Sequence, residues 1–181
     1  LLPKLVAAQM WQVLPEVVIK GSLEDLSLSQ SLNESNLNEI DVVLIGPGIG
    51  KSDMTWLEGQ SIVQRFKGLL VLDADAINQL AISSQGFKWL VEREGPTWIT
   101  PHKGEFLRLF PEFSSLNPID AAKKASQLTG ATVLLKGAHS VVASQSGMIW
   151  QLVETSEYSA RLGWGDVLAG FAAGFGAIGL A

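Results

Sequence analysis

The sequence predicts an α/β domain with a mostly parallel central sheet. Strand-like apolar runs alternate with helix-like segments along the whole chain, which is the pattern of layered α/β folds. Two runs, 41–45 and 69–72, are almost continuously apolar, as expected for strands covered on both faces. The length of 181 residues fits one domain, and no repeat or linker divides it. We therefore expect a single domain over residues 1–181.

The elements are expected in a regular order. Helices are predicted where apolar residues recur at helical spacing, and Ser52 or Asp53 is predicted to cap the helix 53–66. Pro101 ends the strand before it, and Ser146-Gly147 predicts an antiparallel hairpin late in the chain. The predicted helices are 5–14, 53–66, 76–80, 87–92, 103–109, 120–128 and 165–181. The predicted strands are 16–19, 41–45, 69–72, 97–100, 131–135, 140–143 and 148–153, and the segment 21–38 is predicted as a short helix and loop.

Composition excludes several classes of protein. Hydrophobic residues make up 47% and charged residues 17%, so most of the chain can bury a core and is not disordered. The net charge of −5 argues against a nucleic-acid partner. The absence of cysteine excludes disulfides, thiolate metal sites and cysteine nucleophiles, and two histidines exclude a three-histidine zinc site. No secretory signal is evident, and the apolar run 167–181 is shorter than the roughly 20 residues that span a bilayer. We expect a cytoplasmic enzyme without a membrane partner.

Four predicted strands end in polar or glycine-rich turns, namely 46–50, 73–75, 100–105 and 136–140. Because ligands of open parallel sheets bind outside the carboxyl ends of the strands, these turns are expected to line one crevice. The stretch Gly163-Trp164-Gly165-Asp166 then opens the last helix. A helix N-terminus with accessible amides favours an anion, and an aspartate beside it is suited to general-base chemistry.

Two familiar glycine motifs fit the first turn poorly. Gly46, Gly48 and Gly50 give G-x-G-x-G, which is not the dinucleotide-binding fingerprint. Gly50-Lys51-Ser52 supplies the end of a P-loop, but only three residues separate Gly46 from Gly50 where four are required. The segment Lys51-Ser52 is therefore interpreted as a loop-to-helix transition.

Five motifs together carry a family resemblance. GPGIG, VLDADAIN, ITPHKGE, LLKG and GWGDVLAG occur in this order, and from about Leu14 to Ala181 the chain resembles the ADP/ATP-dependent NAD(P)H-hydrate dehydratases of the ribokinase-like superfamily. The resemblance implies a ribokinase-like three-layer α/β/α fold that is incomplete at both ends, since the family's opening strand and last helices are missing. It also implies a homo-oligomer, and a fused or separate epimerase domain as partner.

The family reaction would be the repair of hydrated NADH or NADPH. The resemblance implies that ADP or ATP, with Mg²⁺, phosphorylates the ring hydroxyl and that loss of phosphate restores the dihydronicotinamide. Bacterial members use ADP and eukaryotic members ATP, and this sequence does not distinguish the two donors.

Site roles follow from the matched motifs. Asp166 would be the catalytic base, and Glu105 would hold Mg²⁺ through water, with His102 in the place of the superfamily's usual asparagine. Residues expected to face the substrate are Gly48, Gly50, Asp73 and His102, together with Asp166. Residues expected to bind the nucleotide are Lys136, Gly137, Ala138, His139, Ser140, Gly163, Trp164 and Gly165. Trp164 departs from the family, which usually has a small residue there.

Each of these residues also has a purely structural interpretation. Asp166 and Glu105 suit the first turn of any helix, Asp73 and Asp75 could cap one, and Lys136 could pair with a neighbouring carboxylate. His102 and His139 could lie in surface turns. Two other functions stay open from the sequence: a small-molecule hydroxyl kinase of the thiazole or pyridoxal type, and a non-catalytic nucleotide-binding domain.

Overall fold

One six-stranded sheet forms the centre of the molecule. The computed structural model describes residues 37–50, 53–154 and 163–180. Neighbouring strands among β1 to β4 are parallel, whereas β4–β5 and β5–β6 are antiparallel. The predicted mostly parallel sheet with a late hairpin is thus confirmed. In sheet order the strands are β1 (Val42–Ile45), β2 (Leu69–Leu72), β3 (Thr97–Ile99), β4 (Thr132–Leu135), β5 (Val141–Ala143) and β6 (Ile149–Gln151).

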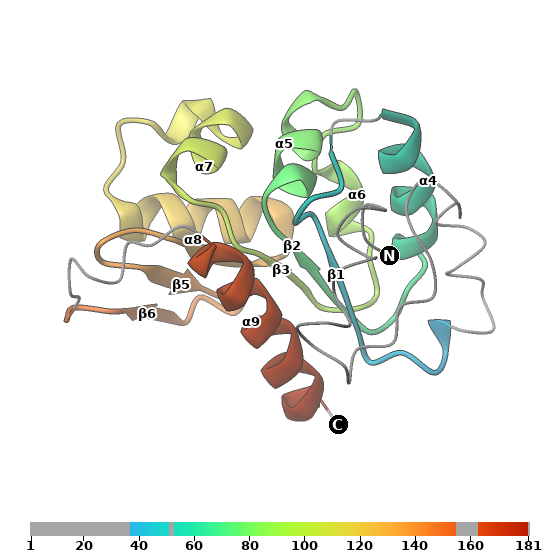
Figure 1. Ribbon diagram of the computed structural model, residues 1–181. Coiled ribbons are helices and arrows are strands. Elements are labelled where there is room, and N and C mark those ends of the chain that lie inside the picture. The colour runs from blue at the N-terminus through green and yellow to red at the C-terminus, as the bar shows by residue number, and fades with distance from the viewer. Residues whose placement is uncertain (1–36, 51–52, 155–162, 181) are drawn as a thin grey trace.

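In the part of the chain that the structure describes, helices cover the two faces of the sheet unequally. The last helix, α9 (Trp164–Leu180), crosses one face over β1 and β2, and the other helices pack on the opposite face (Figure 1). Those helices are α4 (Asp53–Val63), α5 (Asp75–Ile82), α6 (Lys88–Val91), α7 (Lys103–Leu109) and α8 (Pro118–Thr129), with the short 3₁₀ helix η1 (Pro111–Phe113) after α7. The described residues therefore form three layers, helix on sheet on helix, as the family resemblance implies.

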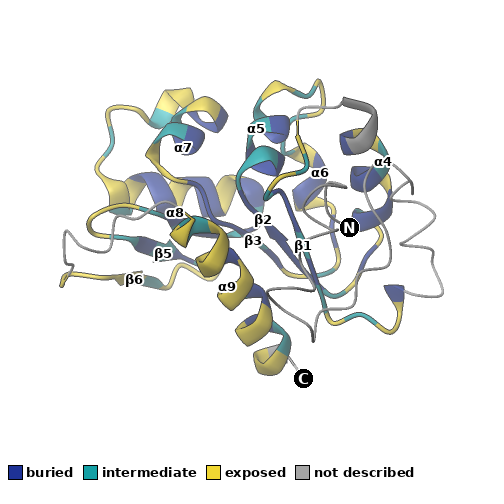
Figure 2. Ribbon diagram, viewed as in Figure 1, coloured by how far each residue is buried: buried dark blue, intermediate teal, exposed yellow. Residues whose placement is uncertain are grey.

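Strand β2 shows why both layers are needed. Its four residues are all fully buried, and their side chains alternate between the two faces. Leu70 and Leu72 join the large core beneath α4 to α8, whereas Leu69 and Val71 pack with Ala173 of α9. Figure 2 shows the central strands as a largely buried layer between partly exposed helices. This double burial explains the continuous apolar run in the sequence.

Most predicted elements are found, with boundaries shifted by a few residues. Helix α4 ends at Val63 instead of residue 66, because tighter three-residue turns follow and bring Phe66 into the core. Helix α8 begins two residues earlier than predicted, since Asn117 caps it and Pro118 occupies the first helical position. The predicted elements at 5–14 and 16–19 lie outside the described residues.

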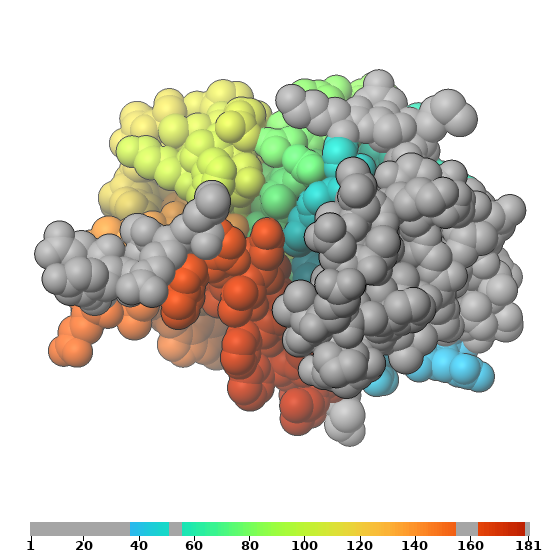
Figure 3. Space-filling model, in the orientation of Figure 1, coloured from blue at the N-terminus to red at the C-terminus, as the bar shows by residue number. Residues whose placement is uncertain are grey.

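Helix α9 approaches the sheet closely on one side and is open on the other. Gly176 has no room for a side chain, because a Cβ there would overlap the Leu69 side chain and crowd the Trp98 ring. The outer face is apolar and exposed, with Phe171 and Phe175 stacked on each other, and it is visible at the front of Figure 3. Among the described residues, no helix is long and apolar enough to cross a membrane.

A buried arginine holds the amino edge of the sheet. The Arg93 guanidinium donates to the carbonyls of Val63 and Gly68 and to the Thr97 hydroxyl. It also lies 5.9 Å from the centre of the Phe66 ring. Burial lowers the pKa of Arg93 to about 10. These contacts fix the amino edge, while the opposite, carboxyl edge carries the polar turns.

Gly46 allows the end of β1 to lie directly against the residue that follows β2. Its φ is +135°, and a Cβ at this position would overlap the Asp73 carbonyl oxygen. The amide of Asp73 donates to the Ile45 carbonyl at 3.1 Å, which holds the two strand ends in this close arrangement. Gly48 also has a positive φ, of +70°, but a Cβ there would lie in open space.

We predict that Gly46→Ala lowers the free energy of unfolding by about 3 kcal/mol or more, because it combines a disfavoured φ with a backbone clash. Gly48→Ala is the matched control and is expected to cost about 1 kcal/mol from the φ alone. Urea unfolding of the two variants measures both values. Equal losses would show that the close approach of Gly46 to Asp73 contributes nothing.

Candidate functional site

The carboxyl ends of β1 to β4 meet at one edge of the sheet. Backbone hydrogen bonds continue past the strands, from Thr100 to the Leu72 carbonyl at 3.1 Å and from Lys136 to the Pro101 carbonyl at 2.8 Å. His102 and Lys136 also form a parallel bridge beyond β3 and β4. The four turns that the sequence singles out therefore begin side by side, in the order of the strands.

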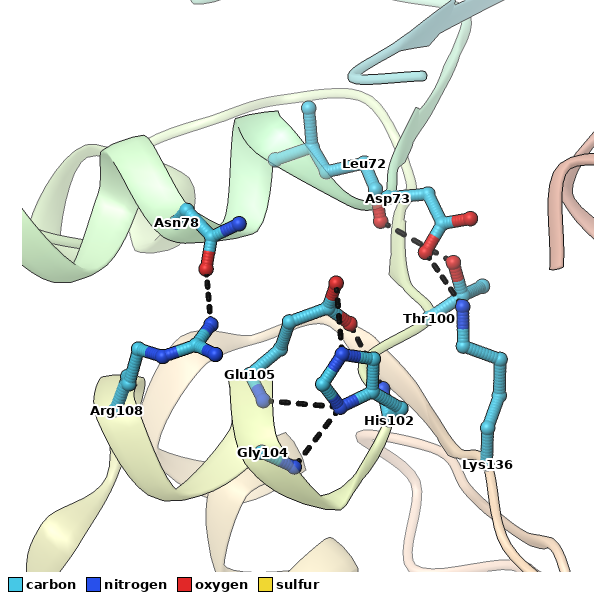
Figure 4. A network of polar contacts seen from close by, with 9 residues as sticks. All are labelled: Leu72, Asp73, Asn78, Thr100, His102, Gly104, Glu105, Arg108 and Lys136. Carbon is cyan, nitrogen blue, oxygen red and sulfur yellow. Dashed lines mark hydrogen bonds and ion pairs between the residues drawn. The ribbon is translucent and has the colours of Figure 1, made fainter. Parts of the chain in front are cut away.

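An ion pair spans this edge. Lys136 Nζ donates to Asp73 Oδ1 at 2.7 Å, and the side chains are only 18% and 2% exposed (Figure 4). Asp73 follows β2 and Lys136 follows β4, so the lysine stem reaches across the end of β3, where Thr100 lies buried. Neighbouring strands are roughly 4.8 Å apart, and a long flexible stem is what such a crossing requires. The interpretation of Lys136 as a partner of a carboxylate is thus correct.

Neither aspartate of the turn after β2 caps helix α5 with its side chain. The N-cap residue is Ala74, which has an unusual φ of +48° for a residue with a Cβ. Asp73 is committed to Lys136, and Asp75 Oδ2 accepts a hydrogen bond from the Gly50 amide at 3.1 Å. Backbone strain of this kind is concentrated at functional sites, where surrounding contacts hold it in place.

The lysine also borders the start of α9. A Cβ on Gly165 would lie 3.7 Å from Lys136 Nζ, so the ammonium stands beside the first turn of this helix. Asp166 is in the same turn and is exposed, and Gly163 just before the helix has a φ of +85°. Trp164 is also exposed. The positive end of the α9 dipole and the Lys136 ammonium therefore lie side by side, and both favour the binding of an anion there.

His102 and Glu105 form a capping box at the start of α7. His102 Nδ1 accepts from the amides of Gly104 and Glu105, and Glu105 Oε2 accepts from the His102 amide at 2.9 Å. The Glu105 side chain is buried, whereas the His102 imidazole is about half exposed. The structural interpretation of Glu105 as a first-turn helix acid is therefore correct for this structure, and its expected role in metal binding remains a prediction.

The turn after β4 lies beside a pocket of about 340 Å³. Residues 136–139 form one wall, and Phe106, Leu107 and Phe113 supply much of the apolar lining. Lys103 also lines this pocket and, like His139, is exposed. Within the turn, the Ser140 hydroxyl accepts from the Gly137 amide and donates to the Gly137 carbonyl, so the loop is fixed by its own contacts. Apolar pockets of this size with a few polar groups are typical of small-molecule sites.

The chain is similar to known proteins of one family. A family model described as NAD(P)H-hydrate dehydratase matches residues 6–180. The chain belongs to this family. A bifunctional NAD(P)H-hydrate repair enzyme from Synechocystis is 42% identical over 161 residues, covering 88% of this chain and 30% of that protein. The chain thus spans about a third or less of the curated relatives that it matches.

Solved structures show the same ribokinase-like fold. An ADP/ATP-dependent NAD(P)H-hydrate dehydratase from Bacillus subtilis, crystallised with ATP and Mg²⁺, is 26% identical with a TM-score of 0.62, covering 76% of this chain and 47% of that one. A hydroxyethylthiazole kinase from Pyrococcus horikoshii has a TM-score of 0.63 at 19% identity, covering 84% and 61%. At that identity the kinase shares the fold alone.

Several site contacts are absent from the sequence analysis. The identity of Asp73 as the carboxylate that pairs with Lys136, the contact of Asp75 with Gly50 and the place of Arg108 beside α5 are all new. The sequence does carry one signal for the pairing of Asp73 with Lys136, because an acid follows one predicted buried strand and a base follows another. Only the strand order, with β3 between β2 and β4, shows that the Lys136 side chain crosses the end of β3.

We predict that Asp73→Asn lowers the free energy of unfolding by about 2 kcal/mol, because it leaves a largely buried ammonium without its carboxylate. The matched control is Glu94→Gln, which breaks the exposed pair of Lys67 and Glu94 at 2.9 Å. That pair raises the pKa of Lys67 and lowers the pKa of Glu94, but solvent screens it, so the control should unfold like the parent. Urea unfolding compares the two, and a parental value for Asp73→Asn would contradict the role given to the ion pair.

Proposed function

We propose that the protein dehydrates hydrated NADH or NADPH with an adenine nucleotide as phosphoryl donor. The ring hydroxyl takes the terminal phosphoryl group of ADP or ATP, and inorganic phosphate then leaves to restore the dihydronicotinamide. The net products from ATP are the reduced dinucleotide, ADP and phosphate, and from ADP they are the reduced dinucleotide, AMP and phosphate. The observation that carries the proposal is Lys136, which is paired with Asp73 and stands beside the turn of α9 that bears Asp166.

The surroundings of Lys136 support binding of the nucleotide at this edge. An ammonium held between a carboxylate and the start of α9 offers a fixed positive charge to a phosphate. Gly163 precedes helix α9, and Trp164 and Gly165 begin it. The first four amides of a helix have no hydrogen-bond partner within that helix. The apolar pocket beside residues 136–139 is suited to a flat base, with Lys103 and His139 as nearby polar groups.

Asp166 is proposed as the general base. Its exposed carboxylate lies in the first turn of α9, where the helix dipole favours the ionised form that accepts a proton. It would accept the proton of the ring hydroxyl as that oxygen attacks phosphorus, while the amides of the turn and Lys136 stabilise the charge on the transferred group. Gly48, Gly50, Asp73 and His102 are proposed to face the substrate from the turns that follow β1, β2 and β3.

Magnesium is proposed as a companion of the nucleotide. Among the described residues, no three carboxylate or imidazole side chains gather as a metal site, and both Glu105 oxygens are close to His102. Mg²⁺ commonly keeps several waters and binds one or two carboxylates together with substrate phosphates. We propose that Glu105, through water, borders such an ion, which would offset the phosphate charge when bound.

The remaining partners are proposals of the same kind. The exposed apolar face of α9 is the surface that supports a homo-oligomer, since contiguous apolar surface marks an interaction site. The curated relatives are named bifunctional, which supports a second, epimerase activity in the same protein or in a partner. A cytoplasmic location is part of the same proposal.

We predict that Asp166→Asn lowers kcat for NADH recovery about 10²- to 10⁴-fold and leaves nucleotide affinity nearly unchanged, since an amide cannot accept the proton. The matched control is Asp120→Asn, because Asp120 is also an exposed acid in the first turn of a helix, α8, and lies outside the site. Absorbance at the NADH band, with hydrated NADH, Mg²⁺ and ADP or ATP, measures turnover.

Both substitutions remove a charge that favours a helix N-terminus, so a purely capping role would affect the two variants alike. Parental kcat in Asp166→Asn, alongside measurable nucleotide binding, would contradict the assignment of Asp166 as the base.

A further inference from the structure

A second pocket lies next to the predicted substrate edge. It has a volume of about 390 Å³ and opens between α5, α7 and the loop that follows β1. Its lining contains one cation, Arg108. The lining residues are Gly50, Asp75, Asn78, Gln79, Ile82 and Arg108.

Arg108 is held in this pocket by a neutral partner. Its Nη1 donates to the Asn78 side-chain oxygen, so the guanidinium reaches from α7 to α5 (Figure 4). Among the described residues, no carboxylate forms an ion pair with Arg108, and its side chain is exposed. A guanidinium has five donors in a planar fork, and most of them remain available here. A positioned and unneutralised arginine is suited to bind a phosphate.

Gly104 connects this arginine with the predicted substrate residue His102. A Cβ on Gly104 would lie 2.8 Å from His102 Cε1 and 3.7 Å from Arg108 Nη2. The imidazole and the guanidinium therefore border the same point on α7, where the glycine leaves room. A ligand that touches His102 can continue across Gly104 to Arg108.

The opposite wall comes from the predicted substrate loop. The Gly50 amide donates to Asp75 Oδ2 at 3.1 Å, which joins this loop to the first turn of α5. The other Asp75 oxygen accepts no hydrogen bond from the described residues. A carboxylate accepts hydrogen bonds from sugar hydroxyls but repels a phosphate. Arg108 and Asp75 together therefore fit a phosphate joined to a sugar better than a bare phosphate.

We infer that this pocket binds the half of the hydrated dinucleotide that lies remote from the reacting ring. Arg108 would bind a phosphate of that half, and Asp75 would accept from a ribose hydroxyl. The inference rests on the proposed function for its substrate, because a dinucleotide whose ring lies at His102 must extend away from the strand ends. Arg108 is thus a binding and specificity residue, five residues after the start of α7 and outside the phosphoryl-transfer chemistry.

The test compares two substrates in Arg108→Ala. Hydrated NADH contains the remote half, whereas the hydrated, reduced nicotinamide mononucleotide lacks it. Loss of a charge-assisted contact predicts a KM for hydrated NADH about tenfold or more above the parent, with kcat unchanged and the mononucleotide KM unchanged. Arg108→Lys should give an intermediate KM. Lys124→Ala removes an exposed cation of α8 as the control and should match the parent.

A binding measurement keeps this test independent of turnover. NADPH fluorescence is titrated with the nucleotide site filled by a non-hydrolysable ATP analogue, and Arg108→Ala should weaken affinity about tenfold. If no dehydration is found but this loss appears, the proposed function fails and the pocket assignment stands. Parental affinity in Arg108→Ala, or equal losses for the dinucleotide and the mononucleotide, would overturn the inference.

Discussion

The ion pair between Lys136 and Asp73 is the contact on which the site depends. It joins the end of β4 to the end of β2 across β3, at 2.7 Å and almost out of contact with solvent. Because a buried charge is costly without its partner, each residue fixes the position of the other. The same ammonium stands beside Gly165 of α9. One pair of side chains thus links three strand ends to the helix that carries the proposed base.

The layered fold makes this contact possible. Parallel strands bring successive turns to one edge, and α9 reaches that edge from the face opposite to α4–α8. Two glycines set the spacing: Gly46 lets β1 lie against Asp73, and Gly176 lets α9 lie close to β2 and β3. The charged groups are then positioned by rigid elements, which suits phosphoryl transfer because that reaction depends on position and electrostatics.

Within the described residues, periodicity and turn residues were enough to predict the strands, most helices and the shared carboxyl edge. β2 was found residue for residue, since a run buried on both faces leaves no ambiguity. Contacts set by strand order could not be read from the chain, and the crossing of β3 by Lys136 is one of them. Glu105 shows a second limit of prediction from the sequence. An acid three residues after His102 suits either a metal site or a helix cap, and only the side-chain geometry shows that Glu105 belongs to a cap. Arg108 gave no local signal, because Asn78 lies 30 residues away.

The central claim is that phosphoryl transfer at this edge restores a reduced nicotinamide. One reaction with hydrated NADH, Mg²⁺ and nucleotide tests it most directly, when absorbance at the NADH band and phosphorus NMR are followed together. We expect recovered NADH and an equal amount of inorganic phosphate, with either ADP or ATP consumed. A stable phosphorylated alcohol without recovered NADH would instead show a kinase, and bound but unconsumed nucleotide would contradict catalysis altogether.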